Sequence, residues 1–414
     1  MTQSVFTVVS DVAAAHLPAL REALAVIRAD PAGNALVPFA RFETLHFASL
    51  VLAEGPGKLI FEHNVDGTAE DWLAALVAGA GPGLDILYAG STYPGSADAP
   101  AARAWLAERI VRPGAFHIGA TGRTLARIRQ EAGLHQAIQG FLDAEEAAGG
   151  LDGATPAAVR AKVQAFVKAD PSFDWAATSP PRETPRERLV NQARLYGTAA
   201  GAVALAPALL PALAVAVVVL LVKERLDAVQ QGPPDADHVR LLEAEEDFVA
   251  QNHLSSVIPV KPGLLRKLTL PVVLYALNLV ARVTATKGQL GGIPSIHFAH
   301  WSVIDEGRHL VFLSNFDGSW ESYLGDFIDK AATGLTAVWS NTVEFPRTRL
   351  LAFQGAADGP RFRQWARAHQ CSTAAWYTAY PTLTMSTIDD NTSIREDLFA
   401  PLDEKGTAAW LARL

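Results

Sequence analysis

The sequence predicts an α+β protein made of two similar βαββαβ units with a mostly helical insert between them. Residues 58–73, "KLIFEHNVDGTAEDWL", are echoed by residues 309–324, "HLVFLSNFDGSWESYL", so that the two Asp-Gly steps lie 251 residues apart (66 to 317). In both copies, β-rich stretches alternate with segments whose apolar residues recur at helical spacing. The chain of 414 residues is also too long for one ordinary domain.

The two copies align element by element over about 100 residues each. Each is expected to run strand, helix, strand, strand, helix, strand. In the first copy, strands are expected at 5–9 and 39–51, helices at 14–27 and 69–77, and the last strand within 83–94. In the second copy, the corresponding helix covers 264–283 and the corresponding last strand lies within 334–346. The predicted divisions are a first repeat at 1–95, an insert at 96–247, a second repeat at 248–350 and a C-terminal covering segment at 351–414.

The repeated Asp-Gly step has a purely structural interpretation. Gly67 and Gly318 are suited to a positive φ at the end of a strand, and Thr68 or Ser319 to capping the helix that follows. In this interpretation the Asp-Gly step is a turn that ends a strand and starts a helix, with no role in chemistry.

The βαββαβ order is that of the ferredoxin-like unit, and two such units can pair their open sheet faces within one chain. The sequence therefore predicts two tandem ferredoxin-like repeats that form an intrachain dimeric α+β barrel. The segments "NFDGSWESYL" and "IHFAHW" resemble uncharacterised bacterial members of the superfamily that holds dye-decolorizing peroxidases and chlorite dismutases.

This resemblance implies a haem site. In dye-decolorizing peroxidases, the Asp of a GxxDG motif works beside an Arg on one haem face, and a His binds iron on the other. Carried over, the resemblance implies Asp317 and Asp66 with Arg41 as catalytic residues, and His300 or His297 as haem ligand, with His300 on the metal. Arg41 comes into this set because residues 37–45 align over 296–304, which places it opposite His300.

A second candidate is "GAFHIGATGRTLARIRQ", in which His117 precedes a turn and Thr121 is expected to cap a helix carrying Arg123. Free N–H groups at a helix start, together with an arginine, suit an anion such as a haem propionate or a phosphate. The alternative is an ordinary capped amphipathic helix.

Composition narrows the classes of partner and compartment. The net charge of −8 provides no basic surface for nucleic acid. The single cysteine, Cys371, forms no intrachain disulfide and fits a reducing cytoplasm. No Cys or His spacing typical of a structural zinc site is present.

The most apolar stretch is 195–222, where 28 consecutive residues carry no charge. It is flanked by Arg188 and Arg194 on one side and by Lys223 and Arg225 on the other. Pro207 and Pro211 interrupt its helix hydrogen bonds and favour a hairpin of two short legs.

Three placements remain open for this stretch: association with one side of a membrane, a buried core or oligomer interface, or a true span. The first is favoured, because a single crossing would put the two repeats on opposite sides of the bilayer. The expected location is then peripheral or monotopic at the inner membrane, on its cytoplasmic side.

Two functions follow from these features. The first is a haem-dependent, peroxidase-like oxidoreductase acting on a small apolar or membrane-borne substrate. The second is a non-catalytic, membrane-associated barrel that binds a lipid-like ligand or a partner protein. The substrate, the ligand histidine and homo-oligomerisation stay open at this point.

Overall fold

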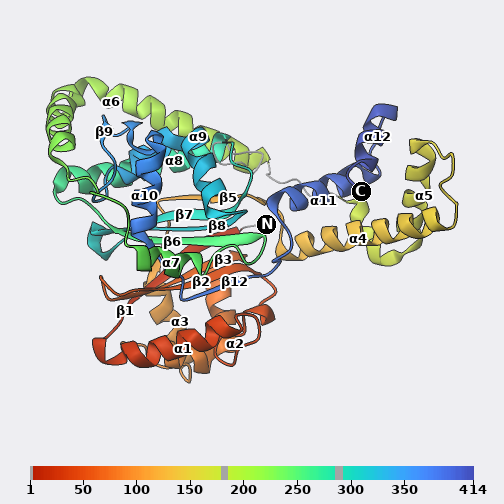
Figure 1. Cartoon of the computed structure of the whole chain (residues 1–414), viewed down its shortest axis with the longest axis horizontal. Helices are drawn as coiled ribbons and strands as arrows, with labels where there is room; N and C mark the ends of the chain where they lie inside the picture. Colours follow the sequence, from red (N-terminus) through yellow and green to blue (C-terminus); the bar gives the residue numbers. More distant parts are fainter. Residues whose placement is uncertain (1–2, 179–184, 285–291) are drawn as a thin grey trace.

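The computed structural model describes residues 3–178, 185–284 and 292–414. Its centre is a pair of five-stranded sheets in which every strand pairing is antiparallel, and this confirms the α+β class. Figure 1 shows the sheets one above the other, with helices on both outer sides and a group of helices projecting to the right.

The first sheet has the strand order β12-β2-β3-β1-β4. Four of its strands come from the N-terminal half, and the edge strand β12 (Ala375–Thr378) comes from the end of the chain. The elements of this half are β1 (Gln3–Asp11), α1 (Leu17–Ala29), β2 (Leu45–Ala53), β3 (Lys58–Asp66), α2 (Ala69–Leu87), α3 (Ala99–Glu108) and β4 (Ile110–Val111).

The second sheet repeats this pattern with the order β11-β6-β8-β7-β5. Its edge strand β5 (Ala115–Ile118) comes from the N-terminal half, so each half contributes one strand to the other's sheet. The remaining elements are β6 (Gln251–Pro259), α8 (Leu264–Thr284), β7 (Ile296–Ile304), β8 (His309–Asp317), α9 (Trp320–Trp339), the hairpin β9 (Thr348–Arg349) and β10 (Phe353–Gln354), α10 (Gly359–His369) and β11 (Gln370–Cys371).

Alternation along the strands divides the core into layers. On β3, Phe61 packs outward against α1 and α2, whereas Ile60 packs inward against the other sheet. On β8, Phe312 packs outward and Leu313 inward. The molecule is therefore layered as helices, sheet, sheet and helices, and both faces of each sheet are covered (Figure 1).

The predicted last strand of each repeat is wrong. Residues 83–87 continue helix α2, and residues 334–339 continue helix α9. The fourth strands are instead β4 and β11, two residues each, which follow a further helix in both halves. A two-residue strand is too short to show a period, and this is why the pattern of apolar residues did not reveal it.

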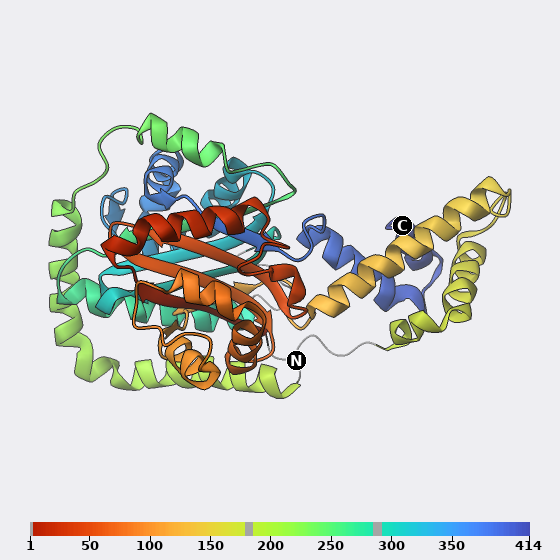
Figure 2. The same cartoon turned by 90° about the horizontal axis from the view of Figure 1, so that it is seen from below.

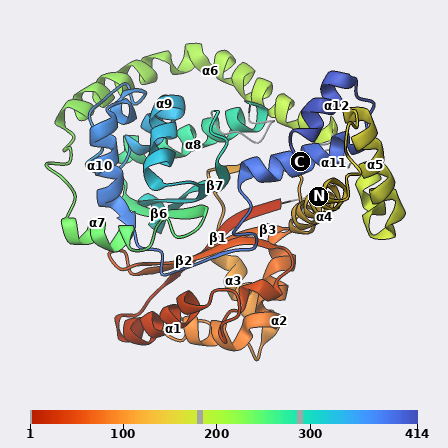
Figure 3. The same ribbon diagram turned by 45° about the vertical axis from the view of Figure 1, so that its right-hand side comes forward.

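A helical arm projects from the sheets. It consists of α4 (Leu125–Ala147), α5 (Pro156–Ala169), α11 (Met385–Leu398) and α12 (Glu404–Leu411), and it has its own apolar core around Ile138, Val163, Leu398 and Trp410. A buried ion pair of 2.6 Å joins Glu131 on α4 to Arg395 on α11. Figure 3 shows these four helices gathered at one end of the molecule.

The apolar stretch 195–222 is not a hairpin. It lies inside one continuous helix, α6 (Pro185–Leu226), which precedes α7 (Ala236–Glu243). Pro207 and Pro211 lie within α6, and Figure 2 shows this helix bent around two sides of the body. Two helical segments, Arg188–Leu226 and Leu264–Arg282, are long and apolar enough to cross a membrane.

Candidate functional site

In both halves the Asp-Gly step is a turn between a strand and a capped helix, as the structural interpretation expects. Gly67 has φ of 90° and Gly318 has φ of 82°, values that L side chains rarely adopt. The side chain of Thr68 caps α2 by accepting from the Asp71 N–H, and that of Ser319 caps α9 by accepting from the Ser322 N–H.

The two aspartates have a further structural task. Asp66 Oδ2 accepts a hydrogen bond of 2.7 Å from the backbone N–H of Leu125, the first residue of α4. Asp317 Oδ2 accepts a bond of the same length from Met385, the first residue of α11. Each carboxylate thus binds the positive end of an arm helix, and we refer to Asp66 and Asp317 with these bonds as the aspartate clamps.

A histidine accompanies each clamp. His297 Nε2 lies 2.6 Å from Asp317 Oδ1 in a hydrogen bond, whereas His46 Nε2 lies 3.1 Å from Asp66 Oδ1 without the direction of one. Both histidines sit where the pairing of their strand shifts register, between Leu45 and Phe47 and between Ile296 and Phe298. Such irregularities re-aim a side chain, here toward the neighbouring aspartate.

This symmetry corrects the predicted alignment of Arg41 with His300. Arg41 lies in a short 3-10 turn before β2 and is exposed, so the expected strand 39–51 begins only at Leu45. The strand registers make His297 the equivalent of His46, and His300 the equivalent of Ser49, in the two halves. No ion pair joins the exposed side chain of Arg41 to Asp66 or Asp317 among the described residues.

The predicted anion site at the start of α4 is occupied by the protein itself. Thr124 caps α4, not Thr121, and the carboxylate at the helix start is that of Asp66. Arg123 is buried and pairs with Asp389 at 2.7 Å. His117 is buried on β5. Arg123 thus joins the segment before α4 to Asp389 on α11.

A second group of polar side chains lies between the sheets. Inward-facing positions of the five strands β2, β3, β6, β7 and β8 contribute it, and all its members are buried. We call it the inter-sheet cluster; its residues are Ser49, Glu62, Asn64, His253, His300 and Asn315.

Glu62 is the centre of the inter-sheet cluster. Its carboxylate accepts hydrogen bonds from Ser49 Oγ at 2.7 Å, Asn64 Nδ2 at 2.8 Å and Asn315 Nδ2 at 3.2 Å. No Lys or Arg of the described residues forms an ion pair with it. Its two oxygens therefore accept three hydrogen bonds from neutral side chains and face no cationic side chain among the described residues.

Two histidines lie just outside hydrogen-bond reach of this carboxylate. His253 Nε2 is 3.8 Å from Glu62 Oε2, and His300 Nδ1 is 3.7 Å from Glu62 Oε1. Burial lowers the pKa of His300 to about 4 and also lowers the pKa of His253, in both cases against the opposing effect of Glu62. Both imidazoles are therefore neutral near pH 7.

The residues of the expected haem site do not fit a haem. His300 is fully buried between the sheets beside Glu62, and His297 Nε2 is already bonded to Asp317. Arg41 is exposed on the turn before β2, and both carboxylate oxygens of Asp317 are engaged. In the described part of the chain, no group of three or more His, Cys, Asp or Glu side chains is arranged to hold a metal ion.

Sequence reasoning missed Glu62 and did not pair His46 with its equivalent His297. A signal existed for His46, because "LHFA" at 45–48 and "IHFA" at 296–299 are 251 residues apart, the same spacing as the two Asp-Gly steps. Glu62 carried no such signal. Its partner Asn315 is 253 residues away in sequence. A single Glu within an apolar strand forms no periodic pattern that would mark it as part of a site.

No family model, no curated protein and no solved structure matches this chain. No likeness to a known protein therefore bears on its function.

Proposed function

We propose that the protein is a monotopic membrane protein whose paired sheets are held at a bilayer surface by α6 and α8. The observation that carries the proposal is the exposure of α6, whose most apolar 18-residue window has none of its residues buried. Val203, Leu205 and Val215 are 74%, 59% and 65% exposed, so apolar side chains meet solvent along the helix. An apolar surface of this extent marks a membrane or protein contact.

Helix α8 extends this surface. Leu264, Leu268 and Val272 recur every four residues and are 72%, 60% and 66% exposed, while Leu270 and Leu274 on the opposite side are buried in the core. Helix α8 lies alongside α6 in Figures 1 and 2. Together the two helices form a membrane surface that belongs to the body of the protein.

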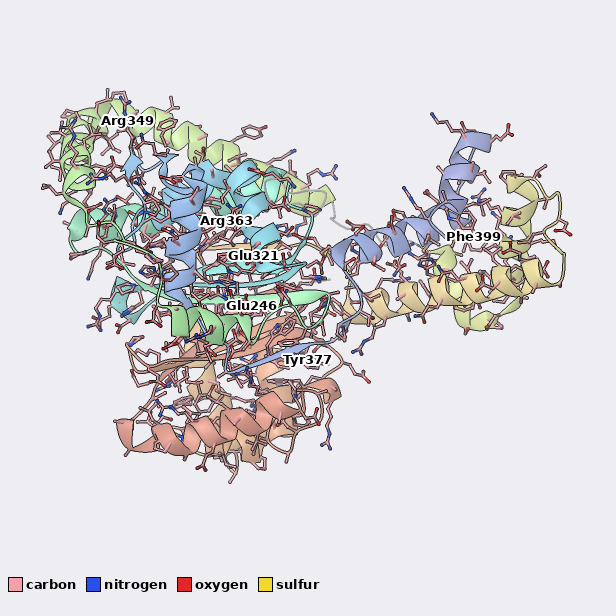
Figure 4. All side chains as sticks on the ribbon, viewed as in Figure 1. Glu246, Glu321, Arg349, Arg363, Tyr377 and Phe399 are labelled. Atoms are coloured by element: carbon pink, nitrogen blue, oxygen red, sulfur yellow. The ribbon has the colours of Figure 1, made fainter. Side chains whose placement is uncertain are left out.

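Basic residues surround the ends of α6. Lys223 and Arg225 lie in its last turn, and the hairpin β9–β10 adds Arg347 just before it and Arg349 on β9, which Figure 4 places beside α6. Cationic side chains beside an apolar surface favour a leaflet that contains anionic lipid. The same hairpin also exposes Leu350 and Phe353.

The hairpin is fastened to α6 by Glu224. This buried carboxylate accepts hydrogen bonds from Thr348 Oγ1 at 2.8 Å and from the N–H groups of Leu350 and Leu351 at 2.9 and 2.7 Å. Leu350 and Leu351 both have positive φ, a conformation that costs free energy for leucine. Glu224 therefore holds a strained turn with its leucines at the end of the proposed membrane surface.

Binding to one leaflet fits the connectivity better than a crossing. The two sheets share strands, so both halves must lie on the same side of a bilayer. The 28 uncharged residues of α6 would extend about 42 Å as a helix, longer than the roughly 30 Å hydrocarbon core. A bent helix lying within one leaflet accommodates this length.

Vesicle flotation tests the proposal. We expect the full chain to float with phosphatidylcholine vesicles, and more strongly when anionic phosphatidylglycerol is added. Leu205→Glu with Val215→Glu should reduce the floating fraction at least about tenfold, because each charge is costly in hydrocarbon. Val26→Glu, at a half-exposed position on α1, is the matched control and should leave flotation unchanged.

A different outcome would identify the surface as a protein interface. If the native chain stays in the supernatant as a single species, and the α6 double variant changes its mass in solution, the membrane proposal fails. A second copy of the chain would then be the partner that covers α6.

We also propose that the paired sheets are tandem ferredoxin-like units forming an intrachain dimeric α+β barrel, as in the superfamily that the sequence resembles. The strand orders β4-β1-β3-β2 and β11-β6-β8-β7 support this proposal, because each is the order of that unit. The haem peroxidase hypothesis stays a prediction without support from the site geometry. A Soret band in protein expressed with ample haem would restore it.

A further inference from the structure

A pocket opens on the seam between the two halves, away from α6. Its cavity volume is about 170 Å³, and α1, α7 and the segment joining β11 to β12 surround it. Its wall includes Arg28, Glu245, Glu246, His253, Cys371 and Trp376. Figure 4 shows Glu246 at this seam, near α7, between the two layers of sheet.

The hydrogen bonds around Asn315 fix the protons on His253. Trp376 Nε1, which only donates, lies 2.8 Å from Asn315 Oδ1, so this atom is the amide oxygen and Asn315 Nδ2 is the donor to Glu62. His253 Nδ1 lies 3.0 Å from the same oxygen and therefore carries a hydrogen. In the neutral imidazole, Nε2 is then a bare acceptor.

This bare acceptor has no hydrogen-bond donor among the described residues. His253 Nε2 is buried and lies near Glu62 Oε2, an atom that accepts as well when the carboxylate is charged. A buried acceptor without a donor is costly, so a ligand that supplies an N–H or O–H would be bound favourably.

The charge around the pocket selects among such ligands. Glu245 pairs with Arg28 at 2.8 Å and Glu246 with Arg367 at 2.7 Å, so the carboxylates at the wall are already compensated. Glu62 is not, since its neighbours in the described part of the chain are neutral imidazoles and uncharged hydrogen-bond donors. A cation near His253 would offset the buried negative charge, and the ring of Trp376, stacked on His253 at 6.1 Å, offers a further attraction.

We propose that this pocket binds a small primary ammonium compound, which donates an N–H to His253 Nε2 while Glu62 balances its charge. The site has no counterpart elsewhere in the repeat. The position equivalent to His253 is Val5 in the first half, and the position equivalent to Glu62 is Leu313 in the second half. It is independent of the membrane surface on α6, so either proposal can fail alone.

Cys371 makes the proposal testable, because it is the single cysteine of the chain and lines the pocket while half-buried. The experiment follows alkylation of the full chain by N-ethylmaleimide at fixed pH and ionic strength, using mass spectrometry. Ethylammonium chloride is expected to slow the reaction several-fold. Ethanol, which is neutral, and sodium acetate, which is anionic, are expected to leave the rate unchanged.

The variant Glu62→Gln removes the charge while keeping the size and one acceptor. It is expected to be alkylated at the wild-type rate but to lose protection by ethylammonium. A second measurement, on the wild type alone, keeps the test decisive if this variant does not fold: ethylammonium should raise the melting temperature more than sodium chloride does at equal ionic strength. Protection by ethanol equal to that by ethylammonium, or no effect of ethylammonium on either measurement, would overturn the proposal.

Discussion

The two halves of the chain are alike where they hold the fold and different where they hold polar groups between the sheets. Both halves have an aspartate clamp, with a histidine at a strand irregularity and a capped helix after the Asp-Gly step. Between the sheets, by contrast, Glu62 comes only from the first half, and His253 and His300 only from the second. Shared features thus explain architecture, and the unshared residues are where a site should be sought.

The largest loss of stability is expected when the aspartate of either clamp is replaced, and the loss should differ between the two clamps. Asp317→Ala removes hydrogen bonds to Met385 N and to His297, whereas Asp66→Ala removes one to Leu125 N and a less directed contact with His46. We expect the free energy of unfolding to fall by about 3 kcal/mol for Asp317→Ala and about 2 kcal/mol for Asp66→Ala. Urea denaturation would measure both, and equal losses would contradict the inequality.

The dependence of stability on pH should reveal the contribution of His300, which has no histidine at the equivalent position of the first half. Burial lowers the pKa of His300 to about 4, from about 6.5 in an unfolded chain. The folded state therefore binds fewer protons, so this contribution to stability is complete above pH 6.5 and is lost as the pH falls toward 4. His300→Ser, which copies Ser49 of the first half, should make the acid loss shallower by up to about 1.4 kcal/mol per pH unit.

The same titration of Ser302→Ala provides a control on β7, because this change leaves every histidine in place. Thermal denaturation between pH 4 and pH 7.5 would compare the slopes. A slope for His300→Ser that matches the wild type would mean that His300 has the same pKa in the folded and unfolded states.

The helix caps should show how similar the halves are. Thr68→Ala and Ser319→Ala each remove one side-chain acceptor from a helix start. Each is expected to lower the free energy of unfolding by about 1 kcal/mol, with little difference between them. Chemical denaturation of both variants checks this, and a difference well above the error would indicate that one cap has a second role.

The smallest effect is expected at Arg41. Its side chain is exposed on a turn and no ion pair joins it to another of the described residues, so Arg41→Ala should change stability by less than about 0.5 kcal/mol. It should also leave vesicle flotation and the protection of Cys371 unchanged. A loss in either assay would reveal a role that the structure does not explain.

The sequence predicted those features that local chemistry determines. The Asp-Gly turns, the capping residues Thr68 and Ser319, and the helix over 264–283 all depend on neighbours within a few positions, and all are confirmed.

Features that depend on register or on distant partners were not predictable in this way. Alignment of 37–45 with 296–304 shifted the first strand by eight residues, because the alternation of a strand is preserved under an even shift. Because of that shift, Arg41 was aligned with His300, whose true equivalent in the first half is Ser49. The inter-sheet cluster was not predicted for a related reason: its members come from strands far apart in the chain.

The exchange of edge strands has a consequence for the order of events during synthesis. Strand β2 emerges from the ribosome early, but its neighbour β12 follows more than 300 residues later, a delay of roughly 15–60 s at common elongation rates. The first sheet must wait for that time with an open edge, which is a hazard for aggregation. Helix α6 is complete well before β12, so under the membrane proposal the nascent chain can reach a bilayer before its first sheet is complete.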